Sequence, residues 1–132
     1  MTEAEYLSHQ GSEAMPSLNH SYLCMEILRQ LLADEEILPM PELTLDIGKG
    51  VTPDISIFSR NQIKPNFMRD VIKFQEPPRL AIEILSPTQT IQELLEKASS
   101  LVNGGVKAVW TVEPYGRTVF ITTQAGEKIF HG

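Results

Sequence analysis

The segment Arg79-Leu80-Ala81-Ile82-Glu83-Ile84-Leu85 decides the fold. It is an apolar run with β-branched residues, it is too short for a helix, and Ser86-Pro87 ends it, which is typical of a buried central strand. Glu83 is the one residue in the run that does not suit a buried strand. The segment therefore predicts the centre of a sheet and a carboxylate that needs a partner.

A helix and a second strand follow this segment. Thr90 and Glu93 have the spacing of a capping box, and apolar residues with helical spacing follow them, which predicts a helix over 91–103. Residues 107–113 are expected to form a strand. The whole stretch 79–113 predicts a βαβ unit with two parallel strands and a right-handed connection.

The N-terminal half of the chain predicts a helix and a hairpin. Leucine and isoleucine residues with helical spacing indicate a helix over 20–33, with Asn19 as its N-cap. Residues 42–47 alternate between apolar and polar side chains, and a turn with two glycines leads to a second strand at 52–58. These two strands are expected to pair as a hairpin.

The remaining segments are a helical turn, a long loop and two strands. The helical turn is expected around Glu3 to Leu7. Residues 59–78 contain three prolines and no clear period, so they are expected to form a loop with at most a helical turn. Strands are expected at 118–123 and 127–130. The predicted fold class is α/β, with a mixed central sheet flanked by helices and one βαβ unit.

Length and composition limit the class of protein. With 132 residues, 42% of them hydrophobic, the chain can form one core, and we expect a single domain over residues 1–132. No stretch reaches the roughly 18 apolar residues of a membrane helix, and the N-terminus lacks a basic signal region, so we expect a cytoplasmic protein with no membrane contact. Cys24 is the only cysteine, which excludes an internal disulfide and a zinc site built from several cysteines.

Charge is unevenly distributed along the chain. The formal net charge of −6 opposes non-specific binding to nucleic acid. Residues 60–79, here called the basic loop, nevertheless contain Arg60, Lys64, Arg69, Lys73 and Arg79. These charges would either keep a solvated loop soluble or contact phosphates. The place of the loop between Asp54 and Glu83 adds weight to the second interpretation.

Asp54 and Glu83 are two acids at positions where apolar strand residues are expected. An ionised carboxylate in a buried strand is costly unless it is paired, hydrogen-bonded or bound to a metal. Asp54 follows Pro53, which removes a donor from the strand and favours an edge or a bulge. Two acids on neighbouring strands would suit a metal ion. The alternative is that Asp54 caps its strand and Glu83 faces solvent.

Lys97 is a third candidate. It lies four residues after Glu93, a spacing that also suits a simple surface ion pair. Around the predicted helix it lies roughly 40° from Leu101, at the border of the apolar stripe. Its stem could therefore run along the sheet and bring an ammonium group beside Glu83.

Four segments stand in an order and spacing typical of one protein family. They are Thr52-Pro-Asp-Ile-Ser-Ile57, Leu80-Ala-Ile-Glu-Ile-Leu-Ser-Pro87, Glu96-Lys97 and Gly105-Val-Lys-Ala-Val-Trp-Thr-Val-Glu-Pro114. These segments resemble the motifs of a bacterial family often called Uma-two, which belongs to the PD-(D/E)XK nuclease superfamily. The resemblance covers about residues 20–123. It implies a restriction-endonuclease-like fold and a metal-dependent endonuclease that acts on DNA.

The resemblance also implies roles for single residues. Pro53-Asp54 is similar to the PD element and Glu83 to the (D/E) element. The two carboxylates and the backbone carbonyl of Ile84 would hold Mg²⁺ or Mn²⁺. Leu85 stands in the superfamily's lysine position, and Lys97 matches the lysine that this family places on the following helix. Lys97 would orient a water molecule or stabilise negative charge.

The N-terminal part of the chain departs from the family pattern. The hairpin that usually carries a further glutamate is shortened, and Glu13 is the candidate for that acidic ligand. His20 matches a common family position and is a candidate accessory residue, with a cap or packing role as the alternative. Leu101 stands where the family tends to have an aromatic residue.

Partners follow from the same resemblance. Arg60, Lys64, Arg69 and Lys73 would contact the phosphate backbone of DNA, and the negative net charge predicts weak binding by a monomer and better binding by a homodimer. Three hypotheses stay open. The chain is a metal-dependent endonuclease, an inactive relative that binds nucleic acid or dimerises, or a structural domain whose two acids are incidental.

Overall fold

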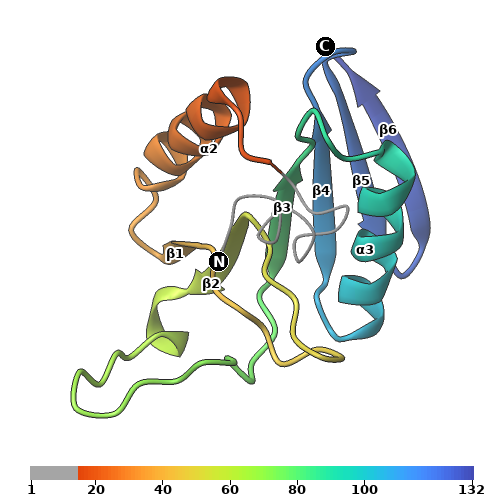
Figure 1. Cartoon of the computed structure of the whole chain (residues 1–132). Helices are drawn as coiled ribbons and strands as arrows, with labels where there is room; N and C mark the ends of the chain where they lie inside the picture. The colour runs from red at the N-terminus through yellow and green to blue at the C-terminus, as the bar shows by residue number, and fades with distance from the viewer. Residues whose placement is uncertain (1–14) are drawn as a thin grey trace, which may run out of the picture.

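The computed structural model describes residues 15–132, so the turn expected around Glu3 to Leu7 and the candidate ligand Glu13 lie outside the described residues. The described chain contains one sheet and two α-helices (Figure 1). In chain order the elements are α2 (Leu18–Leu31), β1 (Ile37–Pro41), β2 (Ile55–Ser59), the 3₁₀ turn η1 (Arg60–Gln62), β3 (Leu80–Ile84), α3 (Ile91–Asn103), β4 (Ala108–Glu113), β5 (Thr118–Thr123) and β6 (Gly126–His131).

The six strands form a mixed sheet in the order β1-β2-β3-β4-β5-β6. β3 and β4 are parallel and joined by α3, and all other neighbours are antiparallel. The Thr90 hydroxyl accepts a hydrogen bond from the Glu93 N–H (3.1 Å) and caps α3 at the predicted residue. The predicted α/β class, a mixed sheet flanked by helices with a βαβ unit, is therefore confirmed.

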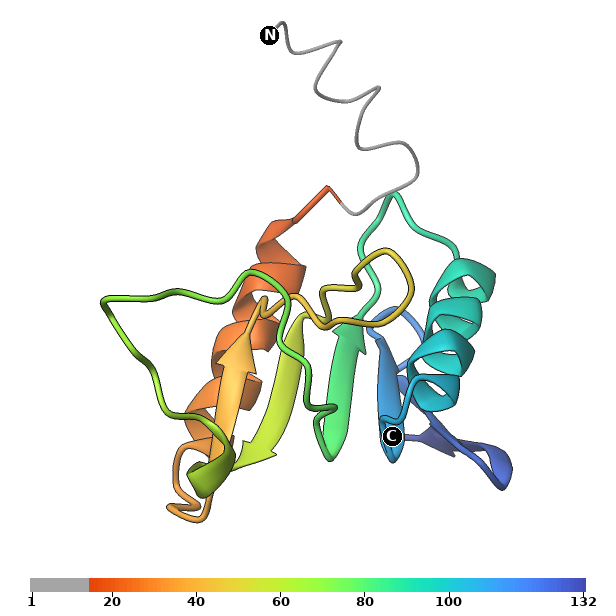
Figure 2. The same cartoon turned by 90° about the horizontal axis from the view of Figure 1, so that it is seen from below.

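The two helices pack on opposite faces of the sheet (Figures 1 and 2). Residues of α2 pack over β1, β2 and β3, against the buried side chains of Ile55, Ile57, Ile82 and Ile84. Residues of α3 pack on the other face, against the buried side chains of Phe58, Ala81 and Val109. The alternation of side chains along β2 and β3 thus builds two cores from the same strands.

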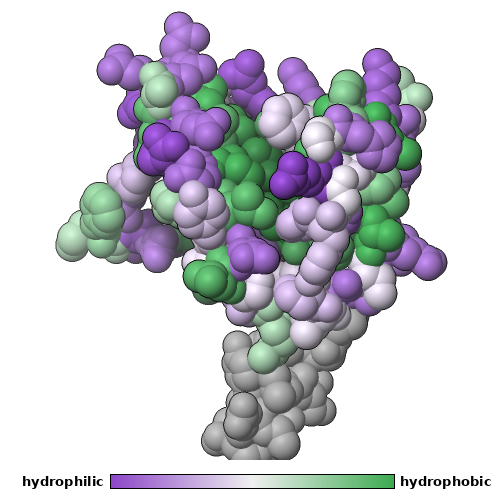
Figure 3. All heavy atoms as spheres, turned by 90° about the horizontal axis from the view of Figure 1, so that it is seen from above, coloured by the Kyte–Doolittle hydropathy of each residue, from purple (hydrophilic) through white to green (hydrophobic). Residues whose placement is uncertain are grey.

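The α2 side of the sheet leaves apolar side chains exposed on β4 and β6. Trp110 pairs in register with Ile82, which packs under α2, and it is 39% exposed. Phe130 lies on the same face and is 53% exposed. Figure 3 looks at the molecule from above Figure 1 and shows hydrophobic side chains gathered in the middle of this side, with hydrophilic ones around them. Exposed apolar surface of this kind often marks a protein contact.

The predicted strand at 42–47 is wrong. The partner of β2 is β1, which contains Pro39 and Pro41 and lies at the edge of the sheet. A proline lacks a backbone N–H, and an edge strand tolerates this because it pairs on one side only. Leu45 is instead buried in the core on the α3 side. Residues 42–54 therefore form a long connection that ends at the start of β2.

The other boundaries differ less from the prediction. Ser17, and not Asn19, caps α2, because its hydroxyl accepts the His20 N–H (3.2 Å) and the helix begins at Leu18. Serine and asparagine are similarly good N-caps, so the sequence could not choose between them. β2 begins at Ile55, three residues later than predicted, so Asp54 precedes the strand. Among the described helices, none is long and apolar enough to cross a membrane.

Candidate active site

Asp54 and Glu83 lie opposite each other, where β2 begins and β3 ends. The pairing of Ile55 with Ile82 continues by one step to place Asp54 opposite Glu83. The backbone N–H of Asp54 donates to Glu83 Oε1 (3.2 Å), and the N–H of Ile84 donates to Asp54 Oδ2 (2.8 Å). Each carboxylate is therefore held by the backbone of the opposite segment.

Lys97 brings a positive charge to Glu83 from α3. Its Nζ lies 3.1 Å from Glu83 Oε1 and also donates to the carbonyl of Thr52 (3.3 Å). The Lys97 side chain is 30% exposed and that of Glu83 only 3%, so the lysine stem reaches from the surface to a buried acid. This reach is possible because Lys97 borders the buried stripe of α3, next to Ala98.

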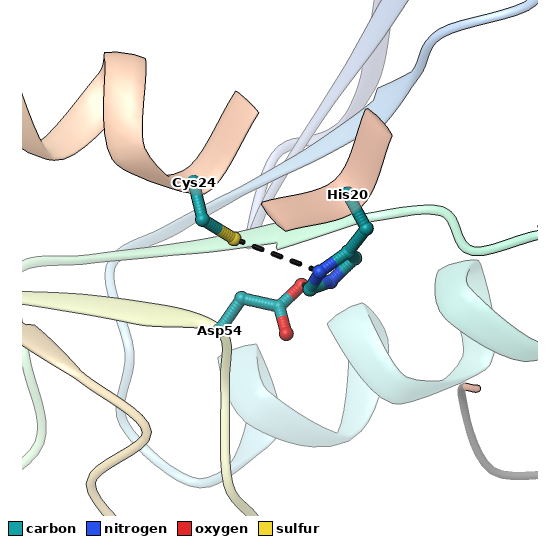
Figure 4. Close-up of side chains that lie close together, drawn as sticks. All are labelled: His20, Cys24 and Asp54. Carbon is teal, nitrogen blue, oxygen red and sulfur yellow. Dashed lines mark hydrogen bonds and ion pairs between the residues drawn. The ribbon is translucent and has the colours of Figure 1, made fainter. Parts of the chain in front are cut away.

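His20 brings a second positive charge, from α2. Its Nε2 lies 3.1 Å from Asp54 Oδ2, and its Nδ1 lies 3.8 Å from Cys24 Sγ. His20 and Cys24 are one helical turn apart, and Figure 4 shows their side chains and that of Asp54 pointing toward one another. We call His20, Asp54, Glu83 and Lys97 the carboxylate cluster. The structure thus brings together the three predicted catalytic side chains, Asp54, Glu83 and Lys97, and the predicted accessory residue His20.

The environment of the cluster shifts two pKa values. Burial raises the pKa of Glu83 to about 7; the positive charge of Lys97 opposes this rise and the negative charge of Asp54 adds to it. The hydrogen bond to Asp54, supported by the one to Cys24, raises the pKa of His20 to about 10. At neutral pH His20 is therefore protonated and paired with Asp54, whereas Glu83 titrates near neutrality.

The oxygen atoms of the cluster fit a hard divalent cation. Mg²⁺ and Mn²⁺ prefer carboxylate and carbonyl oxygens. Asp54 and Glu83 use Oδ2 and Oε1 in the contacts above, and within residues 15–132 no hydrogen bond involves Asp54 Oδ1 or Glu83 Oε2. The negative charge of Asp54 contributes to the raised pKa of Glu83, and a cation between them would remove this repulsion. The Ile84 main chain contacts Asp54 through its N–H rather than its carbonyl.

The sequence matches the model of one protein family, Uma2, described as "Putative restriction endonuclease", over residues 3–129. The chain belongs to the Uma2 family. The match spans nearly the whole sequence, so the resemblance drawn from four short motifs is confirmed. A comparison with curated proteins finds no match.

Two solved structures are similar to this Uma2 chain. A protein described as a "putative nuclease belonging to DUF820", from Anabaena variabilis ATCC 29413, is 25% identical, with a TM-score of 0.76 over 89% of this chain and 70% of that one. The DrdV–DNA complex is 14% identical, with a TM-score of 0.57 over 97% of this chain and 11% of that one. The first similarity supports a nuclease-like protein. The second shows the fold alone.

The basic loop of the Uma2 chain begins far from the carboxylate cluster. It leaves β2 at the end opposite Asp54 (Figure 2), where the backbone N–H and Nε of Arg60 donate to the carbonyls of Glu36 and Glu35. The loop then returns, and Phe74 hydrogen-bonds to the 42–54 connection. Among the contacts of the described residues, none joins the side chains of Arg60, Lys64, Arg69 or Lys73 to the cluster.

Sequence reasoning missed Cys24 as a member of the site. The signal was the spacing of His20 and Cys24, which places them on the same face of a predicted helix. One histidine and one cysteine on a helix are not specific by themselves. Asp54, which lies far later in the sequence, completes the group, and only the tertiary fold shows that it does.

Proposed function

We propose that this Uma2 protein is a divalent-metal-dependent endonuclease that hydrolyses the phosphodiester bonds of DNA. The observation that carries the proposal is the convergence of Asp54, Glu83 and Lys97, from three separate elements, at one end of the sheet. Two carboxylates and a lysine in this arrangement suit metal-assisted phosphodiester hydrolysis. The descriptions of the family and of the Anabaena relative support the same reaction class.

Asp54, Glu83 and the carbonyl of Ile84 would hold the Mg²⁺ or Mn²⁺ ion. When bound, the ion would polarise the scissile phosphate and lower the pKa of a water molecule. Glu83 binds a cation only in its ionised form, which burial disfavours and the ammonium group of Lys97 favours. The Lys97 side chain is partly exposed, and its Nζ would also donate to the attacking water or to charge that develops on the phosphate.

His20 acts in this proposal as a positioning residue for Asp54. The His20 ring and the Ile84 N–H both bind Oδ2, so they fix the orientation of the carboxylate and leave Oδ1 for a ligand. A site whose ligands are fixed before the cation arrives binds that cation at a lower entropic cost. This role explains why a protonated histidine lies beside the proposed Mg²⁺ or Mn²⁺ ligand Asp54 without binding that hard cation itself.

The DNA backbone would lie along the basic loop. Lys64, Arg69, Lys73 and the remaining donors of Arg60 are exposed and would contact phosphates, which gives position and not sequence specificity. Because the net charge is −6, we infer weak binding by one chain and stronger binding by a homodimer. The exposed apolar face around Trp110 and Phe130 is the surface that we propose for the second copy.

A cytoplasmic protein with one domain over residues 1–132 remains part of the proposal. It rests on the single cysteine, which suits a reducing compartment, and on a chain length that suits one core.

A second candidate function is binding without hydrolysis. One observation favours it: Lys97 already pairs with Glu83 and His20 with Asp54, so the buried charges are balanced without a metal. Paired charges of this kind can serve the structure alone. The protein would then be an inactive nuclease-fold module that binds nucleic acid or dimerises.

Cleavage assays on plasmid and single-stranded DNA, with Mg²⁺ and with Mn²⁺, separate the two candidates. The wild type is expected to cleave only with metal, and Glu83→Ala is expected to be inactive. Glu96→Ala changes an exposed acid on α3 and is the matched control, which should keep full activity. Equal cleavage by Glu83→Ala would refute the proposal. DNA binding without any cleavage by the wild type would favour the second candidate.

A further inference from the structure

We propose that His20, Cys24 and Asp54 form a binding site for a soft divalent cation such as Zn²⁺, and that this site shares Asp54 with the Mg²⁺ or Mn²⁺ site. One ligand atom from each of the three residues lies within 4.8 Å of the others. Two of the side chains come from α2 and the third from the segment before β2, and Figure 4 shows that they converge.

The chemistry of the three groups selects the cation. A thiolate, an imidazole and a carboxylate are all zinc ligands, and a thiolate favours Zn²⁺ over Mg²⁺. Zinc bonds of about 2.0–2.3 Å place tetrahedral ligands roughly 3.3–3.8 Å apart. His20 Nε2 is 3.1 Å from Asp54 Oδ2, and the other ring nitrogen, Nδ1, is 3.8 Å from Cys24 Sγ. One ion binds only one of these nitrogens, and with one ligand atom from each residue the three atoms lie within 4.8 Å of one another. Rotation of these side chains would bring the three ligand atoms from within 4.8 Å to the spacing of zinc ligands, and the fourth position would hold water.

Hydrogen bonds fix the ligands on α2 and in the segment before β2. His20 is 7% exposed, and its backbone N–H is fixed by the N-cap Ser17. Two ligands four residues apart on a helix lie on the same face, which is the spacing of other helix-borne metal ligands. The Ile84 N–H holds Oδ2 of Asp54. Cys24 is partly exposed, which leaves the ion a route to the thiol.

Zinc binding would change the bonding of each ligand. The ion binds one ring nitrogen of His20 and the thiolate of Cys24, so both the extra proton of His20 and the thiol proton of Cys24 are released to solvent. Glu83 and Lys97 are not members of this group. Because Asp54 serves both sites, the soft and the hard cation should compete. This competition rests on the proposed metal-dependent function, whereas soft-cation binding does not.

A Co²⁺ titration of the full chain, followed by absorption spectroscopy, tests the inference. Cys24 is the only cysteine, so a thiolate-to-Co²⁺ charge-transfer band in the near ultraviolet can come only from this site. We expect the band in the wild type and in Glu83→Gln, and its absence in Cys24→Ser. Zn²⁺ should abolish the band by displacing Co²⁺. Asp54→Asn and His20→Asn should each weaken binding at least about tenfold.

The outcomes are decisive in both directions. A folded wild-type protein without the band overturns the inference, as does Zn²⁺ affinity that is equal in wild type and Cys24→Ser. Circular dichroism checks that each variant folds, and Cys24→Ala replaces Cys24→Ser if serine disturbs the core. Failure of the proposed nuclease looks different: the wild type would show the band and no DNA cleavage. Mn²⁺ affinity that is unchanged by saturating Zn²⁺ would overturn the shared role of Asp54.

Discussion

The charges of the carboxylate cluster are paired and mostly buried, whereas those of the basic loop are exposed to solvent. In the cluster, Nζ of Lys97 and Nε2 of His20 each lie 3.1 Å from a carboxylate oxygen, and Glu83 is 2% exposed. In the basic loop, Lys64, Arg69 and Lys73 are exposed, and the ion pairs found in residues 15–132 do not include them. The first region is fixed by tertiary contacts, and the second faces solvent.

This difference suits two different tasks. Catalysis needs groups held in one geometry before the substrate arrives, and buried, mutually bonded side chains provide it. Contact with a phosphate backbone needs charges that are accessible and can adjust, and it depends on salt. We therefore expect changes in the cluster to affect chemistry and stability, and changes in the loop to affect binding alone.

The largest effect is expected from Lys97→Met. Removing the ammonium group should lower metal-dependent DNA cleavage by roughly 10²–10³-fold, because a charge that stabilises the transition state is lost. DNA affinity should change little, since the loop is intact. Lys107→Met, which changes an exposed lysine immediately before β4, is the control and should keep wild-type rates. Equal losses in both variants would show that Lys97 acts only through overall charge.

The next effect is on stability as a function of pH, measured without metal. The folded pKa of Glu83, about 7, lies above its ordinary value of 4.5, so its contribution to the free energy of unfolding falls as the pH rises from 4.5 to 7. The folded pKa of His20, about 10, lies above 6.5, so its stabilisation is complete below pH 6.5 and is lost toward pH 10. Both pKa shifts therefore predict a lower free energy of unfolding at alkaline pH.

Two variants separate these contributions in urea titrations. Glu83→Gln should flatten the pH dependence between pH 5 and 7, and His20→Asn should flatten it between pH 7 and 9. His20→Asn should also lose at least about 1 kcal/mol at pH 6, since each unit of pKa shift corresponds to about 1.4 kcal/mol. A wild-type stability that rises from pH 6 to 9 would contradict the ion pair of His20 with Asp54.

The smallest effect is expected from the basic loop. Changing Arg60, Lys64, Arg69 and Lys73 to Ser should weaken DNA binding and lower the slope of log affinity against log salt by up to about 0.9 for each lost phosphate contact. As a control, a variant with Lys107, Arg117 and Lys128 changed to Ser tests whether basic residues outside the loop contribute equally to DNA binding. If both variants have the same salt slope as the wild type, the loop is only a solvated connection.

The elements that the sequence predicted correctly are those that local signals determine. The helix at Ile91–Asn103 and the strand at Leu80–Ile84 were predicted within one residue, because capping, hydrophobic spacing and proline are local signals. Glu83 and Lys97 could be related to each other because a strand and a helix have regular geometry. Their meeting therefore followed from local rules and the family motifs.

Features that depend on distant segments were not predicted. β1 was missed because Pro39 and Pro41 argue against a strand unless its edge position is known, and that position is a property of the whole sheet. The alternation of residues 42–47 predicts a strand, yet Leu45 pairs with Phe74 at the far end of the basic loop and is buried in the core on the α3 side. Cys24 joined the site only through Asp54, which no local pattern connects to it.

The central claim is that Asp54 and Glu83 bind one divalent cation, and calorimetric titration with Mn²⁺ tests it most directly. We predict one ion per chain for the wild type, and a rise in melting temperature with Mn²⁺, since an ion at 100 times its Kd adds about 2.7 kcal/mol to the free energy of unfolding. Asp54→Asn and Glu83→Gln should each abolish both effects, whereas Glu96→Gln should retain them. Equal Mn²⁺ affinity in all four proteins, or no binding to the wild type, would contradict the account.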